Sequence, residues 1–320
     1  MSLCGFQVKT MIIMKKIFIS ILAIAALAAC NKEEAVEVQK GEAIAFGDAF
    51  VDNATKAIYE EASDLDAFKV WGNVDGTNET PLALYGEDGA NVTYTTNWDC
   101  DVVRYWTPSA AYNFTAIANG TAQTCVNGIP TVIAYTQDAT SPADLVYGTA
   151  TATTSDVCVP TGNIVDGRVA FTLRHLLARV KVQFTNQIAP DYTYDITNVK
   201  ITTWKEGVYT IGAATPWAQK AETGSVALPY GDIEDLAATP TAAGAQLIIP
   251  GAPVVLSFDY DLKFDDTVIY SATSVTKTVT TTLAEGNSYN LNVVLKAGNE
   301  IDFTITTLTA WTSDTTVDIQ

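Results

Sequence analysis

The sequence predicts a nearly all-β protein, and two observations support that prediction. Beyond residue 40 the chain is rich in Thr, Val, Ile, Tyr and Ala, in short bursts broken by Gly, Asn, Asp and Pro. Such bursts are typical of strands joined by turns. Within many bursts, apolar and polar residues alternate, which indicates strands with one buried face. We therefore expect half-buried antiparallel strands over most of the chain.

The alternation locates individual strands. It is clear in four segments, at residues 67–72, 91–98, 112–117 and 288–296. In residues 257–264 it is strict, so Asp259, Asp261 and Lys263 are expected together on the face opposite the large apolar side chains. A pair of aspartates can serve a metal or an acid/base site. The sequence around these two aspartates shows no further residue pattern typical of a metal or acid/base site, which favours a solvated sheet face.

One segment mixes two patterns. In residues 168–186, RVAFTLRHLLARVKVQFTN, alternation stops at His-Leu-Leu-Ala and then resumes. A strand, a one-turn corner and a second strand would explain this order. The turn-like Gln-Ile-Ala-Pro-Asp that follows suggests a domain boundary near residues 186–192.

Chain length predicts two domains. From Cys30 to Gln320 there are 291 residues, about twice the usual size of a domain. We assign residues 43–188 to an N-terminal domain and 189–320 to a C-terminal one. Residues 31–42 are charged and lack an apolar pattern, so they are expected to form a flexible tether.

Residues 14–30, MKKIFISILAIAALAAC, resemble a bacterial lipoprotein signal peptide. Two lysines precede an apolar run that is too short for a membrane-spanning helix, and small residues stand just before Cys30. We assign residues 1–30 to the signal peptide region, with a true start at Met14, and expect cleavage just before Cys30, so that the lipidated Cys30 begins the mature protein. The alternative, a buried N-terminal helix, would leave the Leu-Ala-Ala-Cys sequence as coincidence.

The charge balance excludes one class of partner. The chain has 18 Lys+Arg and 36 Asp+Glu, and the signal region holds three of the lysines and no acid, so the mature charge is 15 minus 36, or −21. Binding to nucleic acid requires a basic surface, so no nucleic acid partner is expected. The acidic residues are dispersed along the chain, which indicates a solvated acidic surface.

Several catalytic and metal-binding motifs are absent. His175 is the single histidine, and its leucine-rich setting favours a hydrogen-bonded corner residue over a catalytic role. No nucleotide-binding or zinc-protease motif is present, so we expect no cofactor, no metal and no catalytic site. A glycosidase with two carboxylates remains open, because its acids need no fixed spacing. The tryptophans could stack sugars, although their place in alternating strands favours core packing.

Cys100, Cys125 and Cys158 remain once Cys30 is assigned to the lipid and Cys4 lies before the expected start. They lack close pairing, so no zinc or redox motif is formed. Free thiols are favoured, with one disulfide among the three left open.

Six short motifs together resemble the fimbrillin-like lipoproteins of Bacteroidales, the subunits of type V pili. They are Ile44-Ala45-Phe46-Gly47 with Asn53-Ala54-Thr55-Lys56-Ala57, Phe68-Lys69-Val70-Trp71-Gly72, Arg104-Tyr105-Trp106 with Tyr112-Asn113-Phe114-Thr115-Ala116, His175-Leu176-Leu177-Ala178-Arg179-Val180, Gly286-Asn287-Ser288-Tyr289-Asn290-Leu291, and Ala310-Trp311. Their order and spacing carry the resemblance, which spans nearly the whole mature chain. It implies two transthyretin-like β-sandwich domains of Greek-key type in tandem, and no enzymatic activity.

The resemblance also implies assembly by strand exchange. In that family a protease removes the lipidated segment with the first strand, and an extended segment of a neighbouring subunit fills the groove. Here the removable strand would lie near residues 44–51, with Lys56 as the candidate processing site. Arginine is expected at that position, yet the first arginine is Arg104. A protease of different specificity, or an uncut anchor, tip or free adhesin, would each fit.

The candidate donor lies at the C-terminus, in residues 303–320. Val317 and Ile319 alternate with polar residues and are its candidate groove-filling side chains. Lys32, Glu33 and Glu34, just after the lipid cysteine, resemble the acidic signal that directs lipoproteins of this phylum to the cell surface.

The combined expectation is a structural or adhesive pilus subunit on the outer membrane, held by its lipid and found in the pilus after assembly. Its partners would be other pilus subunits, together with a host or bacterial surface ligand. The alternative from a different class is a lipoprotein of the same fold that does not polymerise and binds glycan or protein ligands.

Overall fold

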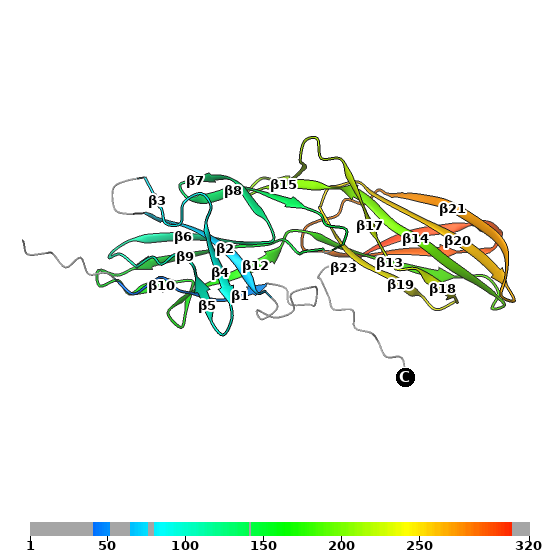
Figure 1. Ribbon diagram of the computed structural model, residues 1–320, viewed down its shortest axis with the longest axis horizontal. Coiled ribbons are helices and arrows are strands. Elements are labelled where there is room, and N and C mark those ends of the chain that lie inside the picture. Colours follow the sequence, from blue (N-terminus) through cyan, green and yellow to red (C-terminus); the bar gives the residue numbers. More distant parts are fainter. Residues whose placement is uncertain (1–40, 52–64, 76–79, 141, 309–320) are drawn as a thin grey trace, which may run out of the picture.

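The computed structural model describes residues 41–51, 65–75, 80–140 and 142–308. Within these ranges the chain is all-β: strands follow one another along the sequence, with one short 3-10 helix, η2, at Ala297–Asn299. Figure 1 shows the strands arranged as an elongated body, with the N-terminal strands at one end and the C-terminal strands at the other. The prediction of an all-β fold is confirmed.

The N-terminal strands form one sheet of ten strands. Its main path runs β1-β12-β9-β6-β2-β4-β5, with β10 on β9, β11 on β12 and β3 on β2. The bounds are β1 Phe46–Val51, β2 Ala67–Asp75, β3 Leu82–Ala83, β4 Ala90–Tyr94, β5 Trp98–Cys100, β6 Ala111–Ala118, β9 Val146–Thr154, β10 Pro160–Gly162, β11 Ile164–Val165 and β12 Arg168–His175. The sheet curls so that β1 approaches β5 at the opposite end of the path.

Alternation explains why this sheet closes around a core. In β6, Tyr112 and Phe114 are buried at 1% exposure each. They meet large side chains of neighbouring strands in one hydrophobic cluster that also contains Phe68 and Phe171. Burial of this aromatic surface drives the sheet to roll up, because each ring removes a large apolar area from water.

The C-terminal strands form two sheets that share a second core. One sheet has the order β19-β13-β22-β23, and the other β17-β14-β20-β21, with β18 also on β14. The bounds are β13 Ala178–Asn186, β14 Tyr192–Trp204, β17 Ser225–Pro229, β18 Ile233–Leu236, β19 Thr241–Ile248, β20 Val254–Phe264, β21 Thr267–Val279, β22 Ser288–Leu295 and β23 Ile301–Leu308. Residues of both sheets, among them Phe184 and Phe258 with ring centroids 5.0 Å apart, fill the space between them.

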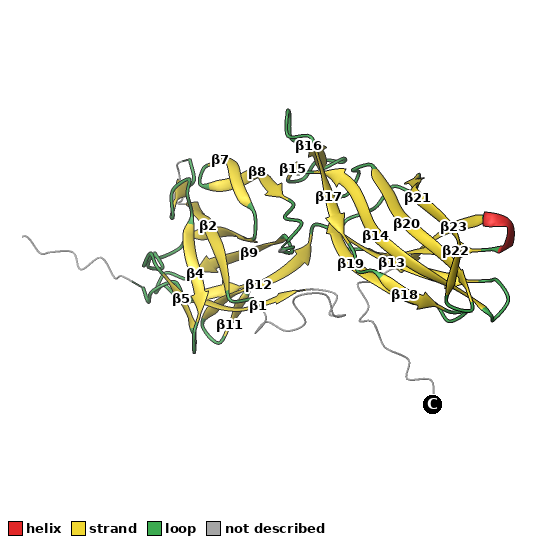
Figure 2. Ribbon diagram, turned by 45° about the vertical axis from the view of Figure 1, so that its right-hand side comes forward, coloured by secondary structure: helices red, strands yellow, loops and turns green. Residues whose placement is uncertain are grey.

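A fourth sheet joins the two ends. Its order is β16-β15-β8-β7, with β7 Thr121–Val126, β8 Ile129–Thr136, β15 Glu206–Thr210 and β16 Trp217–Gln219. β8 and β15 come from distant parts of the sequence yet pair antiparallel, with Tyr135 opposite Gly207. In Figure 2 these strands lie beside the junction between the two ends. A third hydrophobic cluster, including Ile133 and Leu247, packs at this junction.

The strand, corner and strand predicted for residues 168–186 are confirmed as β12, the Leu176-Leu177 corner and β13. The partners of these two strands differ. β12 pairs with β9 and β1, whereas β13 pairs with β19 and β22, which lie beyond residue 240. The chain therefore passes from the N-terminal sheet to the C-terminal sheets at the corner, some ten residues before the expected boundary.

The acidic face of β20 is as expected. Its burial alternates along the strand, with Asp259, Asp261 and Lys263 partly exposed on one face. Lys263 Nζ contacts Asp195 Oδ1 at 2.8 Å and Asp235 Oδ1 at 2.5 Å. Asp259 accepts a hydrogen bond from the Ser274 amide at 2.6 Å. These carboxylates therefore serve the sheet surface and its loops.

Candidate functional site

The segment of residues 41–51 is the candidate functional site, because it occupies a groove between strand β12 and the loop residues Arg104–Trp106. On one side β1 runs parallel to β12, the edge of the sheet path. On the other side the Ile44 amide donates to Arg104 O at 2.7 Å, and the Trp106 amide donates to Glu42 O at 3.1 Å. Main-chain hydrogen bonds thus hold the segment along both edges.

Two side chains of this segment reach the core. Ile44 is 4% exposed and Phe46 is 1% exposed. The Phe46 ring centroid lies 6.1 Å from that of Tyr85, 5.9 Å from Phe114 and 6.0 Å from Phe171. Phe114 belongs to β6, Phe171 to β12 and Tyr85 to the turn between β3 and β4. Without residues 41–51 the groove would expose an aromatic floor between two unpaired edges.

The upstream end of the groove is narrow. A Cβ atom at Gly41 would lie 2.7 Å from both Cys158 Cβ and Trp106 O. Such contacts are too close for any side chain, and one of the two atoms belongs to the backbone. The groove therefore accepts a large side chain at Ile44 and at Phe46, but only glycine at position 41.

The site residues predicted from the sequence are not among those that the structure describes. Cys30, the export residues Lys32, Glu33 and Glu34, the processing residue Lys56 and the donor residues Val317 and Ile319 all fall outside the described residues. The expected removable strand, residues 44–51, corresponds closely to the segment in the groove. Lys56 stands five positions after the end of that segment in the sequence.

The first part of the expected donor region is already paired. β23 lies antiparallel to β22 along its whole length, with Phe303 opposite Val293 and Ile305 opposite Leu291. Ile301, Phe303 and Ile305 pack, partly buried, against the C-terminal core. In this state residues 301–308 complete their own sheet, and only the residues beyond them remain for exchange.

His175 is a buried corner residue, as its leucine-rich setting indicated. Its Nδ1 lies 2.5 Å from Asp144 Oδ2, and the two side chains are 5% and 0% exposed. Burial raises the pKa of the Asp144 carboxyl above its ordinary value, and the hydrogen bond from His175 partly offsets this. The pair is closed off from solvent, so it serves the core.

Among the residues that the structure describes, Cys100, Cys125 and Cys158 form no disulfide. Cys158 is buried, and Cys100 and Cys125 are partly exposed. Burial raises the pKa of the Cys100 and Cys125 thiols, which keeps them protonated and poorly reactive at neutral pH. In the part of the chain that the structure describes, no three His, Cys, Asp or Glu side chains gather closely enough to hold a metal ion.

Sequence reasoning missed the partner of the first strand. Arg104-Tyr105-Trp106 was identified only as a motif, whereas in the structure Ala43 forms a bridge with Tyr105. The two segments are about sixty residues apart, and no local pattern links them. A pocket lined by Arg174 was also missed, because its residues come from four separate segments of the chain.

Comparison with known proteins identifies the family. The profile of the family described as fimbrillin-like matches residues 55–311, most of the chain. The chain belongs to the fimbrillin-like family. A second profile, the prokaryotic membrane lipoprotein lipid attachment site, matches residues 14–31 of this fimbrillin-like protein and includes Cys30. No curated protein matches its sequence.

Solved structures share the fold of this fimbrillin-like protein. A fimbrial protein from Bacteroides vulgatus aligns with a TM-score of 0.54 at 15% identity, covering 77% of this chain and 93% of its own. A candidate cell adhesion protein from Bacteroides uniformis aligns with a TM-score of 0.50 at 13% identity, covering 84% of this chain and 98% of its own. At these identities the likeness concerns the fold.

The lipid attachment site is the feature that relates this protein to a membrane. Among the described residues, no helix has the length and apolar character needed to cross a bilayer. The attachment profile and the fimbrillin-like family together indicate a membrane-anchored surface or pilus protein.

Proposed function

We propose that this fimbrillin-like protein is a structural or adhesive subunit of a type V pilus. It is lipidated at Cys30, exported through Lys32, Glu33 and Glu34, and displayed on the outer membrane until proteolysis releases it for assembly. Its partners are other pilus subunits and, for an adhesive role, a surface ligand. No catalytic step, cofactor or metal is part of this proposal.

One observation carries it: the segment of residues 41–51 is hydrogen-bonded along both edges and buries Ile44 and Phe46 in an aromatic pocket. Cleavage after Lys56 separates this segment covalently from the rest of the protein. A strand from a neighbouring subunit can then restore the main-chain hydrogen bonds and refill the pocket, which is the physical basis of strand addition.

The two ends of the elongated body correspond to two domains in this proposal. We assign the N-terminal sheet and the two C-terminal sheets to two transthyretin-like sandwich domains. The division falls at Leu176-Leu177, because β13 pairs only with C-terminal strands. This replaces the division of the chain into residues 43–188 and 189–320.

The donor would be the chain beyond β23, with Val317 and Ile319 entering the two positions vacated by Ile44 and Phe46. The two residues of each pair are two positions apart in the sequence, so in an extended strand their side chains point to the same face. β23 itself stays in its own sheet under this proposal.

The proposal is tested on protein recovered from the native outer membrane. We expect high-mass polymers whose subunits start near Ala57 and carry no lipid, by intact mass and N-terminal sequencing. Val317→Asp or Ile319→Asp should block polymer formation while leaving the monomer folded, because a buried charge is costly in the acceptor groove. Polymers of the Asp variants, or unfolded monomers, would contradict donor insertion by these residues.

The alternative is a lipoprotein that stays uncut on the surface as an anchor or free-standing adhesin. Two observations favour it: β23 is fully paired within its own chain, and no arginine precedes Arg104. A lipidated monomer that starts at Cys30 in all preparations would support this alternative.

A further inference from the structure

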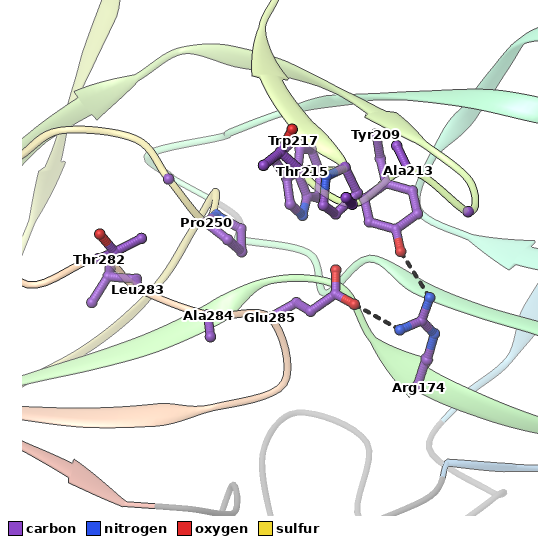
Figure 3. A pocket seen from close by; sticks show the side chains of 14 residues that line it. Arg174, Tyr209, Ala213, Thr215, Trp217, Pro250, Thr282, Leu283, Ala284 and Glu285 are labelled. Carbon is purple, nitrogen blue, oxygen red and sulfur yellow. Dashed lines mark hydrogen bonds and ion pairs between the residues drawn. The ribbon is translucent and has the colours of Figure 1, made fainter.

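A cavity of about 510 Å³ lies where the two ends of the molecule meet. Figure 3 shows its parts: Arg174 from β12, the β15–β16 hairpin with Tyr209 and Trp217, Pro250 after β19, and the loop that ends in Glu285 before β22. This volume falls within the range of pockets that bind small molecules. No step of strand exchange uses it.

A fixed polar group forms one wall of this pocket. Arg174 Nη1 lies 2.6 Å from Glu285 Oε1, and Arg174 Nη2 donates to the Tyr209 hydroxyl at 2.7 Å. The guanidinium also lies 5.5 Å from the centre of the Tyr147 ring. Since Tyr209 accepts from Arg174, its own O–H remains a donor. The wall therefore offers donors and acceptors side by side.

The carboxylate of Glu285 has an unused acceptor. Its Oε2 is buried and has no hydrogen-bond donor among the described residues. A buried acceptor without a partner is unfavourable. A ligand hydroxyl that donated to this oxygen would supply the missing partner.

Beside this polar group, the lining of the pocket is apolar and held in place. The Trp217 indole Nε1 donates to Leu176 O at 3.0 Å, which fixes the ring. Tyr209 packs edge-on against it, with centroids 5.3 Å apart. Pro250 and Leu283 complete this side of the cavity. An aromatic and aliphatic wall suits the C–H face of a saturated ring in its chair form.

The charge of the pocket selects among ligands. Arg174 and Glu285 form an ion pair whose charges offset each other, so the pocket offers no net charge to attract an anion or a cation. Anions are further disfavoured by the chain's net charge of −18. Vicinal hydroxyl groups, which both donate and accept, match a guanidinium, a carboxylate and a phenol placed together.

From these features we propose that the pocket binds a neutral carbohydrate, one or two sugar rings in size. Hydroxyl groups would contact Arg174, Tyr209 and Glu285, and the ring face would pack on the Trp217 side. The proposal does not depend on strand exchange, since a polymerised subunit and a free-standing lipoprotein both retain this pocket.

Saturation-transfer NMR on the full-length protein, in a detergent without a sugar headgroup, tests this. The probes are the methyl glycosides of glucose, galactose, mannose, fucose and N-acetylglucosamine, with N-acetylneuraminic acid as the anionic comparison. We expect saturable transfer to at least one neutral glycoside and at least tenfold weaker binding of the acid. Preferential binding of the acid, or no transfer to any neutral glycoside, would overturn the proposal.

Variants locate the binding. Ala284→Trp fills the pocket from an exposed position, and Glu285→Gln removes the charged acceptor while keeping its shape; each should weaken binding at least tenfold. Ala218→Trp, which is exposed on the β15–β16 hairpin and outside the pocket, is the matched control and should bind as the wild type does. Unchanged binding by Ala284→Trp and Glu285→Gln, or an equal loss in the control, would overturn the assignment.

Discussion

Replacing Phe46 by alanine tests how strongly the first strand is held in its groove. The side chain is 1% exposed and is surrounded by the rings of Tyr85, Phe114 and Phe171 at about 6 Å. Truncating a buried phenylalanine costs about 3–5 kcal/mol, through lost burial and the cavity left behind. Because β1 is the terminal strand in the path of the N-terminal sheet, part of this cost should appear as local detachment of the strand.

Two assays separate these effects. Urea unfolding of the full-length protein, followed by tryptophan fluorescence, measures the change in the free energy of unfolding. Hydrogen exchange at the amides of residues 44–46 and of their partners in β12 measures detachment of the strand. If the whole protein responds, we expect the free energy of unfolding to fall by about 3–5 kcal/mol. If the strand detaches locally, we expect the free energy of opening at these amides to fall by the same amount.

Glu42→Ala is the matched control, since Glu42 is exposed and contributes only its backbone carbonyl to the groove. Its effect should stay within about 0.5 kcal/mol. If Phe46→Ala costs less than about 1 kcal/mol in both assays, the aromatic pocket does not hold the strand. Burial of Phe46 in the groove would then provide too little free energy to support the strand-exchange proposal.

Three further predictions concern paired polar groups. His175→Leu leaves the buried Asp144 without its partner, so at pH 7 it should cost about 3–5 kcal/mol by urea unfolding; an unchanged midpoint would contradict a structural pair. Gln137→Ala removes an amide that donates to Leu247 O at 2.7 Å across the junction and accepts from the Ile249 amide. It should lower the free energy of unfolding by about 1–3 kcal/mol and speed hydrogen exchange at the Ile249 amide. Unaltered exchange would mean that this side chain does not join the two ends. Hydrogen bonds from Ser274 and Asn198 lower the pKa of Asp259, so its stabilising effect is present above about pH 4 and is lost as the pH falls through the folded-state pKa. Asp259→Asn should therefore reduce the loss of stability measured by urea unfolding as the pH is lowered below about 4. The same acid dependence in variant and wild type would refute the assignment.

Alternation along the sequence was enough to predict the strands, because a period of two depends only on which side chains are neighbours in the chain. It placed the acidic residues of β20 on one face and the corner at Leu176-Leu177 between two strands. The lipid attachment site near Cys30 was likewise readable, since a signal peptide is recognised as a linear segment.

The partners of those strands were decided by the tertiary structure. Alternation says which face of a strand is buried, but a strand can pair with any edge that offers free backbone groups and a matching apolar face. The parallel pairing of β1 with β12, the joining of β8 to β15, and the place of β13 in the C-terminal sheet are all contacts between distant residues. The Arg174 pocket has the same origin, because it exists only where the two ends pack together.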